Sequence, residues 1–243
     1  ASSWSFRSKL RTGKLNDNFA KAVQLILSSN GRVIVAGVGK SANIASKIVA
    51  TFNSTGQPAV FLHAADAIHG DLGNIQKNDV VICISKSGNT SEIKYLLPLI
   101  KNMGNKIIAI CGNKDSYLAN QADCVLDASV KKEACPHNLA PTSSTTAQLV
   151  LGDALAICLL ESKNFTDKDF ARFHPGGVLG KKLYLKVSDI VKNNEVPSVQ
   201  IQDKVQKVII EISKKRLGAT AVLEGEKILG IITDGDLRRM LEK

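Results

Sequence analysis

Short apolar runs alternate with longer amphipathic segments from about residue 16 to residue 185. Near-continuous runs of Val, Ile and Ala are typical of strands buried on both faces. We expect strands at Arg32–Ala36, Ala59–His63, Asp79–Ser85, Lys106–Cys111 and Cys124–Asp127. Helices are expected at Lys40–Ser54, Ser91–Met103, Ser116–Ala122 and Thr145–Ser162. Alternating strands and helices imply βαβ crossovers. The sequence therefore predicts an α/β protein with a doubly wound, five-stranded parallel sheet.

A second, smaller unit is expected after a change of pattern near Leu183–Ser188. It begins with Val187–Val191 and a polar stretch that contains Pro197, and continues with a helix-like segment at Val205–Lys215. Two β-like runs, Ala219–Leu223 and Lys227–Ile232, and a short basic helix complete it. We therefore divide the chain into a basic arm (1–14), a main domain (15–185) and a small α+β unit (186–243).

Composition narrows the classes of function. The five cysteines are odd in number and form no C-x-x-C pair, which favours reduced thiols and a cytoplasmic protein. The basic arm lacks the apolar segment of a secretory signal, and no apolar run is long enough to suggest a membrane span. The net charge is +10, but the basic residues are scattered and aromatics are few. We therefore expect small anionic substrates rather than nucleic acid.

Ligands of open α/β sheets bind beyond the carboxyl ends of the strands, so the strand-to-helix turns are the candidate sites. The first turn, Gly37–Ser41, is glycine-rich and precedes a helix start, which favours an anion. It matches the dinucleotide-binding pattern G-x-G-x-x-A, but the acid expected after the second strand is replaced by His63. This difference counts against a nicotinamide enzyme.

Two further turns are rich in hydroxyl groups. Ser85–Glu92 contains four of them with one glycine, and Pro141–Thr146 contains five in a row before an apolar helix. Asn89 or Thr90 could cap the helix after the first of these turns, and one of the five hydroxyl residues could cap the helix after the second. Capping would therefore use only one or two hydroxyls in each turn. The others are available to a ligand that carries phosphate and hydroxyl groups.

The S-x-S-G-x-T pattern of Ser85–Thr90 resembles the phosphate-binding motif of sugar isomerase (SIS) domains, which have a doubly wound α/β fold. Other strings resemble the arabinose 5-phosphate isomerase branch of that family: Gly37–Ser41, His69–Gly73, Lys132–Pro136, Leu139–Thr146, Gly152–Ala156 and His174–Gly177. The resemblance extends from about Leu15 to the last residue. The tail resembles one cystathionine-β-synthase (CBS) repeat, where family members usually carry two.

The resemblance implies interconversion of D-ribulose 5-phosphate and D-arabinose 5-phosphate through an enediol, without a cofactor, for Kdo synthesis that feeds lipopolysaccharide or capsule. Substrate-binding residues are expected at Gly39, Ser41, Ser85, Ser87, Gly88, Thr90, Thr142, Ser143 and Ser144. The resemblance also implies homotetramers, and a nucleotide sugar such as CMP-Kdo acting on the tail.

Catalytic roles are implied for Glu133, Glu92, His174, His69 and Lys40. We favour Glu133 as the enediol base. The alternatives are that Glu133 is a solvated loop charge and that Glu92 only complements a helix dipole. His174 could open the sugar ring or relay protons, and His69 lies in a loop that could reach a neighbouring subunit. Lys40 could pair with phosphate or with an enediolate oxygen.

Two other classes of function stay open. His63, Asp66, His69, Asp71 and His174 could gather around Zn²⁺, although their spacing matches no known motif and an enediol route needs no metal. We expect no metal. A non-catalytic phosphosugar sensor would keep the hydroxyl-rich turns but could lose Glu133 and His174. Because both are present, an enzyme is favoured.

Overall fold

The computed structural model describes residues 17–191 and 194–242. The basic arm expected at residues 1–14 lies outside the described residues. The chain divides into two compact units between Gly180 and Lys181, and each unit is described by itself.

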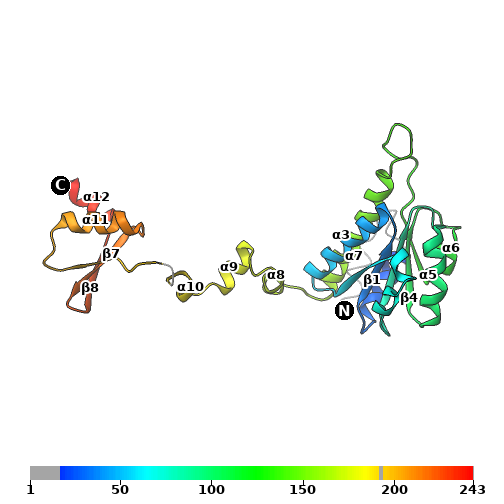
Figure 1. Ribbon diagram of the computed structural model, residues 1–243, viewed down its shortest axis with the longest axis horizontal. Helices are drawn as coiled ribbons and strands as arrows, with labels where there is room; N and C mark the ends of the chain where they lie inside the picture. The colour runs from blue at the N-terminus through cyan, green and yellow to red at the C-terminus, as the bar shows by residue number, and fades with distance from the viewer. Residues whose placement is uncertain (1–16, 192–193, 243) are drawn as a thin grey trace. The chain divides into compact units, whose positions relative to one another are not determined.

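The first unit is built on a five-stranded, wholly parallel sheet, as the sequence predicts (Figure 1). Its strands are β1 (Val33–Gly37), β2 (Ala59–His63), β3 (Val80–Ser85), β4 (Lys106–Cys111) and β5 (Cys124–Asp127). Their order is β2-β1-β3-β4-β5. The direction of winding reverses between β1 and β3, and in sheets of this order the crevice at that reversal binds the ligand.

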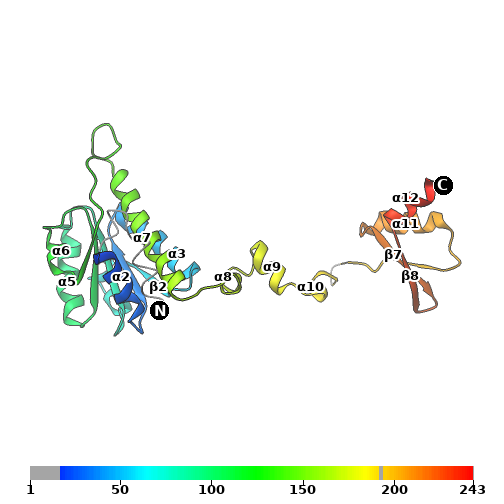
Figure 2. The same ribbon diagram turned by 180° about the vertical axis from the view of Figure 1, so that it is seen from behind.

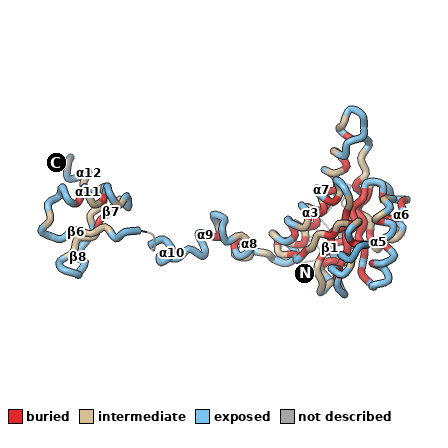
Figure 3. Tube along the Cα trace, viewed as in Figure 1, coloured by how far each residue is buried: buried red, intermediate tan, exposed pale blue. Residues whose placement is uncertain are grey.

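Helices cover both faces of this sheet. One face carries α2 (Asp17–Leu27), α3 (Lys40–Ser54) and α7 (Ser143–Ser162), and Figure 2 shows α2 beside α7. The other carries α4 (Ala64–Ala67), α5 (Ser91–Asn102) and α6 (Tyr117–Gln121). Successive residues of a strand alternate between the two cores: Val33 and Val35 enter the first, Ile34 and Ala36 the second. Burial on both faces explains the continuous apolar runs (Figure 3).

The helices α3 and α7 are in close contact. A Cβ atom on Gly152 would lie 2.3 Å from Ile48 Cδ1, so only glycine fits at this crossing without movement. Lys47 Nζ also contacts the Asp153 carboxylate at 2.6 Å. Within the described part of the chain, only α7 is long and apolar enough to span a membrane by length and composition. Its contacts with α3 and its buried Leu155 indicate a core helix.

Small elements complete the first unit: the 3₁₀ helix η1 (Asp71–Asn74), α8 (Asp167–Phe173) and the beginning of α9 (Val178–Tyr184). The second unit contains the rest of α9, α10 (Val187–Val191), β6 (Ser198–Gln200), α11 (Val205–Lys215), β7 (Ala219–Glu224), β8 (Lys227–Thr233) and α12 (Asp234–Leu241). Its sheet has the order β6-β7-β8, with β6 parallel and β8 antiparallel to β7. The predicted α+β character is confirmed.

Candidate active site

A pocket of about 280 Å³ lies at the carboxyl ends of β1 and β3. Three turns form its wall: the β1–α3 turn, the β3–α5 turn and the start of α7. It is lined by Val38, Lys40, Ser41, Ile84, Ser85, Lys86, Ser87, Thr90, Pro141, Ser144, Thr145 and Gln148. All three turns singled out from the sequence therefore meet at one site, at the reversal of the sheet.

The β3–α5 turn is held by its own hydroxyl groups. Ser85 Oγ and Thr90 Oγ1 are 2.8 Å apart, and the Gly88 amide donates to Ser85 Oγ at 3.1 Å. The Asn89 amide donates to Ser87 Oγ at 3.1 Å. Gly88 has a φ of +66°, a conformation that suits glycine, and a Cβ there would collide with Ser116. The turn is thus held in shape by its own hydrogen bonds.

Two helix starts at this pocket have no side-chain cap. Gly39, the N-cap of α3, has no side chain, and the side chain of Thr90, the N-cap of α5, bonds no backbone amide there. Thr90 was one of the two expected caps, but its hydroxyl bonds Ser85 instead. Uncapped amides and the helix dipole favour an anion. Lys40 lines the pocket in the first turn of α3, where the positive end of the helix dipole disfavours a cation. A bound anion would offset this repulsion.

Glu133 is buried, so the interpretation of this residue as a solvated loop charge is wrong. Its carboxylate accepts from the Thr142 amide at 2.8 Å, the Ser144 amide at 3.1 Å and Ser144 Oγ at 2.5 Å. Lys86 Nζ lies 2.7 Å from its Oε1. These contacts cap α7, a role that the sequence suggested for a hydroxyl of the turn itself. The carboxylate therefore joins the β3–α5 turn to the start of α7.

The surroundings of Glu133 favour its charged form. The Lys86 ammonium, the Ser144 hydroxyl and the two backbone amides hold the pKa of Glu133 well below its usual range, although burial opposes this. An efficient general base has a pKa nearer to neutral pH. To act as the enediol base, Glu133 would have to lose part of this stabilisation.

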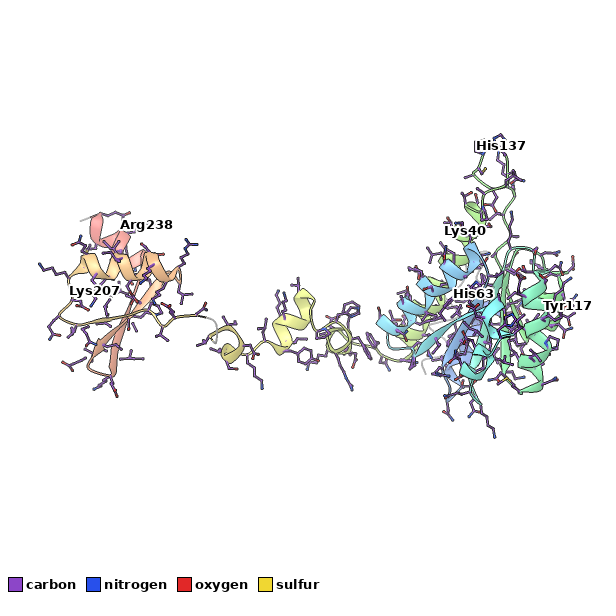
Figure 4. The ribbon with its side chains drawn as sticks, viewed as in Figure 1. Lys40, His63, Tyr117, His137, Lys207 and Arg238 are labelled. Atoms are coloured by element: carbon purple, nitrogen blue, oxygen red, sulfur yellow. The ribbon has the colours of Figure 1, made fainter. Side chains whose placement is uncertain are left out.

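Glu92 lies in the first turn of α5. Its carboxylate accepts from Ser91 Oγ at 2.8 Å, and its pKa is lowered by its own backbone amide, by Ser91 and by attraction to His63. Glu92 does not line the pocket, but it follows Thr90, which does, by two residues. This placement is compatible with both interpretations of Glu92. His63 ends β2 at the same edge of the sheet as Lys40 (Figure 4).

Two predicted catalytic residues do not line the pocket. His69 is exposed, between α4 and η1. His174 follows α8, where its ring stacks on Phe170 with centroids 4.0 Å apart. Phe173 beside it stacks on Phe165, which contacts Gly56 just beyond the end of α3. The pocket is at the start of α3, so about 20 Å of helix separates it from His174 within this unit.

The expected substrate-binding residues divide into two groups. Ser41, Ser85, Ser87, Thr90 and Ser144 line the pocket. Gly39, Gly88, Thr142 and Ser143 are not among its lining residues but adjoin it in the same turns.

Sequence reasoning missed Gln148. It lies four residues after Ser144, on the buried face of α7, and a polar residue on an otherwise apolar stripe was a usable signal. Within residues 17–191 and 194–242, no three His, Cys, Asp or Glu side chains form a group that could hold a metal ion.

Comparison with known proteins agrees with this geometry. A model of the SIS domain matches residues 26–158, and a model of the CBS domain matches residues 187–243. A protein of Escherichia coli CFT073, solved in complex with arabinose 5-phosphate, superposes with a TM-score of 0.65 and 44% identity, covering 71% of this chain and 90% of that one. The fold is therefore that of a sugar isomerase (SIS) domain, followed here by a CBS domain.

Curated relatives make the assignment more specific. Arabinose 5-phosphate isomerase KdsD of Francisella tularensis is 54% identical over 98% of this chain and 76% of its own length. The protein of the same name from Escherichia coli K12 is 47% identical over 94% of this chain and 70% of its own length. The chain belongs to the arabinose 5-phosphate isomerase family, which confirms the resemblance found in the sequence.

Proposed function

We propose that this protein interconverts D-ribulose 5-phosphate and D-arabinose 5-phosphate through an enediol. The observation that carries the proposal is the pocket itself. It combines a hydroxyl-rich turn, two uncapped helix starts and two lysines, which together suit an anionic, hydroxylated ligand. The KdsD relatives are named for this sugar phosphate, and the E. coli CFT073 protein was solved with arabinose 5-phosphate.

The substrate phosphate is assigned to the β3–α5 turn, where Ser85, Ser87 and Thr90 lie. Lys40 then pairs with the phosphate or with the negatively charged oxygen that forms when a proton leaves the sugar. Isomerisation needs a base to take the proton from C2 of the aldose and return it to C1. Glu133 and Glu92 are the two candidates. Glu133 is tied to the pocket wall, whereas Glu92 is less buried and has fewer hydrogen-bond donors.

His69 and His174 enter this scheme through a second subunit. Neither lines the pocket of its own chain, and both are at least partly exposed. We propose a homo-oligomer, with the tetramer as the expected state, in which a neighbouring subunit supplies one or both histidines for ring opening or proton relay. A separate SIS unit is expected to keep the phosphate-binding turn but to lack the histidines that a neighbouring subunit would supply.

The CBS unit is proposed as a regulatory module. Its strand β8 exposes Ile228 and Ile231, with relative accessibilities of 69% and 66%, on an apolar surface suited to pairing with another copy. A nucleotide sugar such as CMP-Kdo is the proposed ligand. We place the reaction in the cytoplasm, in the synthesis of Kdo for lipopolysaccharide or capsule.

Direct turnover tests the proposal. The full chain is incubated with D-ribulose 5-phosphate, and D-arabinose 5-phosphate is separated and quantified over time. Formation of the aldose at a rate proportional to protein concentration is expected. A phosphosugar sensor would bind the sugar phosphate without producing the aldose, so binding without turnover would favour that alternative.

A further inference from the structure

Gln148 places a buried amide in the pocket wall. The residue is 1% exposed and lies on α7, one turn after Ser144. Ser41 Oγ donates to its Oε1 at 3.3 Å, which links α3 to α7. Its Nε2 is buried and has no hydrogen-bond partner among the described residues. A buried amide left half unpaired is costly, and a ligand group in the pocket would complete its hydrogen bonding.

The hydroxyl groups of four neighbouring wall residues already have protein partners. Ser144 Oγ donates to Glu133, and Thr145 Oγ1 donates to the Thr142 carbonyl at 2.9 Å. Ser85 Oγ is within 2.8 Å of Thr90 Oγ1. Gln148 therefore differs from these neighbours, because it lines the pocket and its Nε2 has no hydrogen-bond partner among the described residues.

The group that completes this amide can be deduced from its chemistry. The Ser41 hydroxyl can donate to Oε1 or, with the amide turned over, accept from Nε2. The end of the amide that Ser41 does not pair is then either a donor or an acceptor. A hydroxyl satisfies both orientations, whereas a fully ionised phosphate oxygen satisfies only one. The uncapped helix starts and the hydroxyl-rich turn already suit the phosphate.

We propose that Gln148 binds a hydroxyl group of the sugar and so helps to determine which sugar phosphate the enzyme accepts. This inference rests on the proposed isomerase function. Gln148 is a substrate-binding residue in this scheme, and Ser41 positions it. No proton transfer is assigned to it.

The test compares the binding of two ligands to the whole chain of 243 residues. D-Arabinitol 5-phosphate keeps the hydroxyls and the phosphate but cannot be isomerised, and inorganic phosphate carries the anion alone. In Gln148→Met, calorimetry should show about 10-fold weaker binding of the alditol phosphate, the effect of one lost hydrogen bond with an unpaired ligand hydroxyl. Binding of inorganic phosphate should be unchanged, and the urea midpoint should be unchanged or higher. Gln148→Leu should behave in the same way.

Gln121→Met is the matched control, since it makes the same replacement at a partly exposed amide on α6. It should leave both affinities unchanged. Unchanged alditol phosphate binding in both Gln148 variants would overturn the inference. Parallel weakening of phosphate binding, or a lower urea midpoint in both variants, would also overturn it by showing a structural role. A wild-type chain that neither binds the alditol phosphate nor converts ribulose 5-phosphate would refute the proposed function, and this inference with it.

Discussion

Gly88→Ala tests how tightly the phosphate turn is determined by its surroundings. Gly88 has a φ of +66°, which costs an alanine roughly 1–2 kcal/mol. The new Cβ would lie 2.0 Å from Ser116 Oγ and 2.5 Å from Ser116 Cβ. Ser116 is buried, and its hydroxyl caps α6 by accepting from the Ala119 amide. Rotation of the hydroxyl cannot relieve the contact with Cβ, so the backbone must move, at a cost of about 1–3 kcal/mol.

Gly104→Ala provides the matched control. Gly104 has a φ of +81°, but a Cβ there would meet no atom within 4 Å. Urea unfolding followed by circular dichroism should therefore show a loss of about 1–2 kcal/mol for Gly104→Ala and about 2–5 kcal/mol for Gly88→Ala. Only Gly88→Ala should raise KM, because its amide bonds Ser85. Equal losses in the two variants, with normal KM in both, would show that the contact with Ser116 relaxes freely and would refute this reasoning.

Three further outcomes are expected. Glu133→Gln should abolish exchange of the substrate's C1 or C2 proton with deuterated water if Glu133 is the base, whereas normal exchange would transfer the role to Glu92 or a histidine. The lowered pKa of Glu133 implies stabilisation that is present above its unfolded value, near 4.5, and is lost as pH falls through the folded pKa. Urea midpoints measured from pH 7 to pH 3 should therefore fall less steeply for Glu133→Gln than for the wild type, and parallel profiles would contradict this. A chain ending near Lys186 should stay active but lose inhibition by CMP-Kdo, whereas equal inhibition of both chains would place the nucleotide sugar in the SIS site.

The strands of the main sheet could be predicted from the sequence because strands buried on both faces are continuous apolar runs. Every predicted strand of the main sheet is present, with ends that differ by one residue at most. The strand Ser198–Gln200 was missed because three residues are too few to show a period. The CBS resemblance was more informative there than the pattern of hydrophobic residues.

The interior of the site was less predictable, because its contacts join residues far apart in the chain. Glu133 is paired with Lys86, 47 positions earlier, and nothing near Glu133 in the sequence indicates that it is buried. Its neighbours Lys131 and Lys132 instead suggested a solvated loop. The turn His174–Gly177 suggested a side chain projecting toward a site, but a single chain holds His174 against Phe170. Whether another subunit receives it depends on an assembly that sequence patterns do not describe.

The contact between Gly152 and Ile48 has a consequence for substrate range. Gly152 is one helical turn beyond Gln148, and Ile48 is about two turns beyond Ser41, so the spacing of α3 and α7 at their crossing sets how far apart these two pocket residues stand. A larger side chain at position 152 would press against Ile48, and we expect it to push α3 and α7 apart at this crossing. We therefore expect substitutions at Gly152 to alter the pocket without changing a residue that lines it, which offers directed evolution toward bulkier phosphosugars a place to begin.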